Sequence, residues 1–164
     1  MSDAIAKYST AKGYVQSSYV IMASPNRFKI PNDTTFFLSF HMLCGFAVEL
    51  YLKSFLTHAG YSERTLTREL GHNLQRLHET ARAEGLDDFQ EGMLVQLLNK
   101  HHGSNEFRYA KRATEYRTAN LNEIFLAFST LDFGIDATVG ASASVGKTPG
   151  GFWKLPKERS MWRL

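Results

Sequence analysis

The longest apolar stretch of the chain, residues 36–56, constrains its fold most strongly. It is long enough for a membrane span, but it contains His41, Glu49 and Lys53, which are costly inside a bilayer. A run of this length that carries charge is better placed in the interior of a soluble protein. We therefore expect one long core helix, from about residue 33 to residue 59, and no membrane span.

Other segments repeat apolar side chains at intervals of three and four residues, which is the spacing of one helix face. No useful length alternates with the two-residue period of a strand. The further helices are expected at about residues 8–22, 63–69, 72–84, 88–98, 106–117 and 120–131. The sequence therefore predicts that residues 1–139 form a single all-α domain. Nothing near the N-terminus resembles a signal peptide, so a soluble, cytoplasmic protein is expected.

The composition changes at about residue 140. Residues 140–164 begin with small side chains, continue through Pro149-Gly150-Gly151, and carry five basic side chains against one acidic one. This segment holds a charge of +4. Because the net charge of the whole chain is +3, the remaining residues hold −1 and are close to neutral. Phe152, Trp153 and Trp162 lie among the basic residues. The pattern predicts a flexible tail, with an arm that docks on a partner as the alternative.

Glu49 and Lys53 lie one helical turn apart, in the order that favours an ion pair. Because their helix face is apolar, both charges are expected to be partly buried and paired. The functional alternative is a ligand-binding groove at this face. His72 lies at a helix start, where its ring either satisfies a backbone group or packs on the long helix. We rank that structural role above a catalytic one.

The stretch from His101 to Arg117 is the one cluster of basic and aromatic residues within residues 1–139. His101, Arg108 and Arg112 are candidates for holding phosphate, and Tyr109 is a candidate for stacking on a base. The alternative is a solvated helix face balanced by acidic neighbours. Neither a His-Glu-x-x-His motif nor a pair of cysteines is present, so no metal site and no cofactor are expected.

Two helical motifs and one short element carry a family resemblance. They are Gly45-Phe46-Ala47-Val48-Glu49-Leu50-Tyr51-Leu52-Lys53-Ser54-Phe55-Leu56, then Gly71-His72-Asn73-Leu74 with Leu77, then Phe107-Arg108-Tyr109. In this order they resemble the HEPN family (higher eukaryotes and prokaryotes nucleotide-binding domains), over about residues 35–133. The resemblance implies an antiparallel bundle of four to five helices that is often a homodimer. It also implies an endoribonuclease, or a binding module that has lost catalysis, in systems such as toxin–antitoxin pairs.

Active members of that family have an Arg followed, after four to six residues, by a His, and this chain departs from the pattern. Arg68 precedes His72 with three residues between them, and Arg64 precedes it with seven. His102 and Arg108 are separated by five residues, but in the reverse order.

The leading hypothesis is accordingly a non-catalytic HEPN-like module that binds RNA or a nucleotide. Its partners would be a second copy of itself and a protein such as a nucleotidyltransferase or a toxin. The first alternative is a divergent metal-independent endoribonuclease, with His72, His102 and Arg108 as candidate catalytic residues. The second is a protein-interaction module that uses the C-terminal aromatic arm.

Overall fold

The computed structural model describes residues 2–87, 91–109 and 114–164, and within these residues every regular element is helical. The longer helices are α1 (Asp3–Ala23), α2 (Thr34–His58), α3 (Leu74–Ala83), α4 (Glu91–Gly103) and α5 (Leu121–Val139). The short ones are η1 (Pro25–Lys29), η2 (Thr65–Leu70), η3 (Ala143–Val145) and η4 (Lys157–Arg159). The prediction of an all-α bundle is therefore confirmed.

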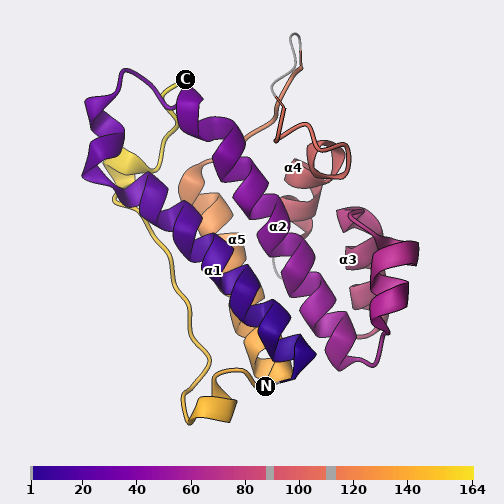
Figure 1. Ribbon diagram of the computed structural model, residues 1–164. Helices are drawn as coiled ribbons and strands as arrows, with labels where there is room; N and C mark the ends of the chain where they lie inside the picture. The colour runs from indigo at the N-terminus through magenta and orange to yellow at the C-terminus, as the bar shows by residue number, and fades with distance from the viewer. Residues whose placement is uncertain (1, 88–90, 110–113) are drawn as a thin grey trace.

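Helix α2 is the centre of the bundle. It contacts α1, α3, α4 and α5, and α1 runs beside it in the opposite direction, with α3 and α4 on the other side (Figure 1). Its innermost side chains are fully buried, among them Phe40, Val48, Leu52 and Leu56. By length and composition α2 is the one helix of the described residues that could cross a membrane. A core helix passes the same test, and half of the apolar window in α2 is buried inside the bundle.

The C-terminal segment packs against the bundle. Trp153 is 5% exposed, and its indole N–H donates to Gln16 of α1 over 2.9 Å. The ring of Trp162 stacks at 5.4 Å on that of His41 in α2. The prediction of a flexible tail is therefore wrong for this part of the chain, because its large aromatic side chains complete the core. Phe152 alone of the three aromatics remains largely exposed.

A buried ion pair joins this segment to the start of α2. The Arg27 guanidinium donates twice to the carboxylate of Asp33, over 2.9 and 2.8 Å, and both side chains are fully buried. Arg27 also donates to the backbone oxygens of Arg159 and Met161, and the Arg163 side chain donates to Asp33 over 3.1 Å. Two basic residues of the segment, Arg159 and Arg163, thus have structural roles, since the Arg159 guanidinium also donates to the backbone oxygen of Ala23 over 2.9 Å.

A second polar network joins α1, α2 and α5. The Tyr51 hydroxyl donates to Asp132 over 2.6 Å, and the Lys12 ammonium donates to Asp132 and to the backbone oxygen of Gly150. Tyr8 donates to Asp136 over 3.0 Å. Burial raises the pKa of Asp132, and the hydrogen bonds from Tyr51 and Lys12 offset part of that effect. This network holds the chain after α5 against α1.

The helix expected at residues 106–117 is absent from the described parts of that range. Residues 104–109 form turns, and residues 114–120 are irregular. The buried ring of Phe107 stacks at 5.7 Å on that of His41, and the ring of Tyr116 stacks on that of Phe107 at 6.0 Å. The prediction fails here because two aromatic anchors fix an irregular path. The capping box expected at residues 88–91 begins in residues outside the described ones.

Candidate functional site

The carboxylate of Glu49 in α2 has partners from α2 itself, from the turn before α3 and from α4. It is 5% exposed and accepts a hydrogen bond from the Lys53 ammonium over 2.6 Å. Nδ1 of His72 lies 3.0 and 2.9 Å from its two oxygens, and Nε2 of His102 lies 2.7 Å from one of them. We refer to Glu49, Lys53, His72 and His102 as the Glu49 cluster.

The backbone before α3 places His72. The short helix η2 ends with a π-type hydrogen bond from the amide of Gly71 to the oxygen of Leu66, over 3.0 Å. Gly71 has a φ of 58°, a left-handed conformation that favours glycine, and it turns the chain toward α3. Asn73 then caps α3 by accepting from the amide of Arg76. His72 lies between these two residues, with its side chain 64% exposed.

A glycine in α2 makes room for His102. A Cβ atom at Gly45 would lie 2.4 Å from Nδ1 of His102, far inside normal contact. Gly45 and Glu49 are one helical turn apart, so the ring of His102 rests on the backbone of α2 while its Nε2 reaches the carboxylate. The His102 ring is 5% exposed, whereas that of His72 is open to solvent.

The cluster keeps Glu49 ionised. Burial alone would raise the pKa of this carboxyl group, but hydrogen bonds from His102, Lys53 and His72 outweigh burial and lower the pKa to about 2. A buried carboxylate with several donors is also the expected form of a compensated internal charge. The structural interpretation made from the sequence therefore describes Glu49 and Lys53 well, although it did not include the two histidines as partners.

Arg108 and Tyr109 lie beside the cluster on the turn after α4. The Arg108 guanidinium lies 5.2 Å from the centre of the Phe46 ring. The ring of Phe46 also contacts that of His102, and the two ring centres are 5.3 Å apart. Arg108 and Tyr109 are both exposed, Tyr109 to 69%. Arg108 is thus linked to the cluster through Phe46 and His102, and Tyr109 follows it in the chain as an exposed aromatic ring.

His101 belongs to a different surface from His102. Its Nδ1 contacts the carboxylate of Glu106, and its ring lies 4.7 Å from that of Tyr116. Together with neighbours on α4 and on the chain before α5 it lines a hollow of about 340 Å³, whose residues are Gln96, Leu97, Lys100, His101, Glu115 and Arg117. The expected ligand-binding set is therefore split between two places, and Arg112 lies outside the described residues.

The Glu49 cluster also contains a metal-ligand grouping that the sequence did not indicate. One donor atom each from Glu49, His72 and His102 lies within 4.8 Å of the others. The three residues lie in α2, just before α3 and in α4, 23 and 30 positions apart, so no short sequence motif contains them. The one local signal is Gly45, one turn before Glu49, where a side chain would exclude His102.

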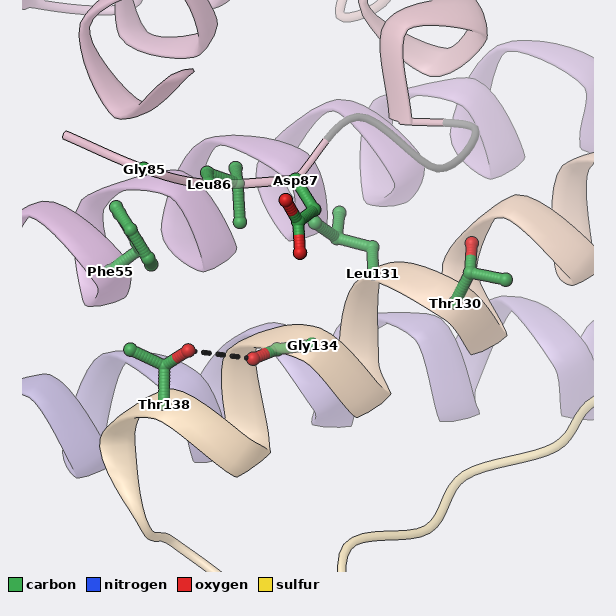
Figure 2. A pocket seen from close by; sticks show the side chains of 8 residues that line it. All are labelled: Phe55, Gly85, Leu86, Asp87, Thr130, Leu131, Gly134 and Thr138. Carbon is green, nitrogen blue, oxygen red and sulfur yellow. Dashed lines mark hydrogen bonds between the residues drawn. The ribbon is translucent and has the colours of Figure 1, made fainter. Parts of the chain in front are cut away.

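The pocket between the end of α2 and α5 offers less chemistry. It is lined by Phe55, Gly85, Leu86, Asp87, Thr130, Leu131, Gly134 and Thr138 and has a volume of about 60 Å³ (Figure 2). Its Thr138 hydroxyl is occupied by a hydrogen bond to the backbone oxygen of Gly134, over 2.9 Å. One carboxylate in a small, mainly apolar hollow does not provide a constellation of reacting groups.

Comparisons with known proteins give no relative: no family model, no curated protein and no solved structure matches this chain.

Proposed function

We propose that this chain is a HEPN-like helical module that binds single-stranded RNA or a nucleotide at the Glu49 cluster and the turn beside it. The observation that carries the proposal is that exposed His72 is held by the buried carboxylate of Glu49, while exposed Arg108 lies on the ring of Phe46 beside this cluster. Phe46 and His102 link the two, because the ring of Phe46 contacts both His102 and Arg108.

The chemistry of these groups suits a phosphodiester. A guanidinium that rests on an aromatic ring keeps its N–H donors in its own plane, where they can bind phosphate oxygens in pairs. The imidazole of His72 provides a further polar group, held in place by Glu49. Tyr109 supplies an exposed ring of the kind on which a base stacks. The Glu49 cluster then serves as the rigid support of the surface.

The test measures fluorescence anisotropy of labelled single-stranded RNA against protein, over a range of salt concentrations and with a chelator present. We expect Arg108→Ala to weaken binding by about tenfold, as for loss of one charged hydrogen bond. It should also reduce the slope of log affinity against log salt by about 0.7, the value for one phosphate contact.

The matched control is Arg64→Ala, which removes an exposed arginine from the segment before η2. This variant should bind as the wild type does. Equal losses in the two variants would indicate a general charge effect and contradict the proposed site. Absence of binding by the wild type to both RNA and free nucleotides would refute the function itself.

From the resemblance we further propose that the module is a homodimer and that a nucleotidyltransferase or a toxin is its protein partner. The oligomeric state follows from light scattering coupled to gel filtration. A mass of one chain over a wide range of concentration would contradict the dimer.

One observation favours a second function, a divergent metal-independent endoribonuclease. His72 is exposed and held through Nδ1 by a buried carboxylate, which is the arrangement of a general base and the group that orients it. Its other ring nitrogen, Nε2, then faces the substrate, and Arg108 would stabilise charge on the phosphate. The reversed order of His102 and Arg108 and the short Arg68-to-His72 spacing keep this function second.

The nuclease is tested by gel analysis of labelled RNA with excess chelator. We expect His72→Gln to lower the initial rate by about 100-fold or more, the usual contribution of a general base. Because the variant is purified in the same way as the wild type, the cleavage that remains in it measures any contaminating nuclease. Cleavage that persists at the wild-type rate in this variant would exclude His72 as the base.

A further inference from the structure

The Glu49 cluster brings together the donor types of a transition-metal site. A carboxylate and two imidazoles are the protein ligands of many zinc centres, with the fourth position left to water or substrate. Here the three donor atoms lie within 4.8 Å of one another. They come from the middle of α2, the entry to α3 and the end of α4, so the packing of the bundle holds the group in place.

The distances between donors are close to those of a tetrahedral site. His72 Nδ1 and His102 Nε2 lie 2.9 and 2.7 Å from the same carboxylate oxygen, Oε2 of Glu49. Around a zinc ion with ligands at about 2.0–2.1 Å, neighbouring donor atoms are about 3.3 Å apart. Each imidazole therefore needs to withdraw by about half an ångström to admit an ion. The exposed ring of His72 has room to do so and also provides a route of entry from solvent.

The surroundings of the three groups support the same geometry. The Lys53 ammonium binds the other carboxylate oxygen, Oε1, which His72 also contacts, whereas Oε2 contacts both histidines and not Lys53. A ligating carboxylate is commonly fixed by such a hydrogen bond from outside the site. Gly45 leaves the space that the His102 ring occupies, because any side chain at this position would collide with it.

We propose that Glu49, His72 and His102 bind one Zn²⁺ ion in a tetrahedral site whose fourth ligand is water or a phosphate oxygen. Nδ1 of His72 and Nε2 of His102 coordinate as neutral imidazole nitrogens, and each ring keeps its proton on its other nitrogen. This proposal can fail or succeed separately from the proposed RNA binding, because RNA binding is measured with a chelator present and therefore without bound zinc.

The test adds Zn²⁺ to protein dialysed against a chelator and then against metal-free buffer. Isothermal titration calorimetry should give one site per chain, and thermal melting should show a higher midpoint with zinc. Substitution of Co²⁺ should give the strong visible absorption bands of a tetrahedral site. His72→Gln should weaken zinc binding by at least about 100-fold, more than the loss of an outer partner costs.

His72→Gln is the decisive variant because its side chain is exposed and its loss should leave the fold intact. His58→Ala removes an exposed histidine near the end of α2 and should bind zinc as the wild type does. Stoichiometric zinc in the wild type that survives His72→Gln would overturn the assignment, as would no zinc binding by the wild type.

Discussion

At the scale of single residues, Glu49 determines the site. A buried carboxylate with one partner would be poorly compensated, whereas this one has three donors, from α2, from the turn before α3 and from α4. The ion pair with Lys53 could be predicted from its four-residue spacing. The contact with His102 spans 53 positions and depends on the packing angle of α4, which no local pattern records. The separation of the His101 and His102 rings, by contrast, follows from the sequence, because adjacent positions on a helix do not share a face.

Gly45→Ala tests the close approach of His102 to α2. A methyl group here would lie 2.4 Å from the imidazole, so the ring must move and the Glu49 cluster must rearrange. We expect the free energy of unfolding to fall by about 1–3 kcal/mol in urea denaturation. The control is Gly13→Ala in α1, where the added atom has nothing within 4 Å. It should raise stability by about 0.5–1 kcal/mol through helix propensity. Equal stability changes in the two variants would contradict the packing of His102.

At the scale of elements, the long core helix could be predicted almost to the residue. The sequence predicts it at residues 33–59, and it runs from Thr34 to His58. The agreement is close because helix-breaking residues on both sides of the apolar segment mark where the helix begins and ends. The helix expected at residues 106–117 is wrong for the described parts of that range, 106–109 and 114–117, because Phe107 and Tyr116 pack inward from irregular backbone there. Propensity is a weak guide where tertiary contacts decide.

Trp153→Ala tests the docking of the C-terminal segment. Its ring is 5% exposed and donates to Gln16, so truncation should leave a cavity and lower the free energy of unfolding by about 3–5 kcal/mol. The neighbouring Phe152 is 71% exposed, and Phe152→Ala should change stability by less than about 0.5 kcal/mol. The measurement is urea denaturation of both variants followed by circular dichroism. Similar, small effects in the two would mean that the segment is free in solution.

At the scale of the whole molecule, the C-terminal segment closes the bundle. Small residues and Pro149-Gly150-Gly151 favour a flexible tail, but this composition is typical only of the first part of the segment. It does not indicate how the aromatic residues after it pack. The pair of Arg27 and Asp33 could not be predicted either, since its further partners include Arg163 and the backbone oxygens of residues 159 and 161. These contacts join the C-terminal segment to the connection between α1 and α2 through a buried charge pair.

Asp33 should make the stability of the whole fold depend on pH. Burial alone would raise its pKa, but hydrogen bonds from Arg27 and Arg163 lower it from 3.8 to about 2. A depressed pKa means that the ionised form stabilises the folded state, fully above about pH 4 and progressively less as the pH falls toward 2. The stabilisation at stake is about 2 kcal/mol.

Asp33→Asn is the matched variant for this dependence. At neutral pH it should be less stable than the wild type by about 3–5 kcal/mol, because Arg27 stays buried without its counter-charge. The difference should shrink by about 2 kcal/mol between pH 5 and pH 2 in urea denaturation. A difference that stays constant over this range would show that Asp33 titrates normally in the folded protein.

The most direct test of the central claim is an NMR titration of isotope-labelled protein with unlabelled single-stranded RNA in the presence of a chelator. The account predicts that amide shifts concentrate at residues 71–73 and 102–109, around His72 and Arg108, and that both the α1 and the α5 surfaces stay unchanged. Shifts confined to the His101 hollow or to the C-terminal segment would contradict the proposed site. An unchanged spectrum at saturating RNA would contradict the function.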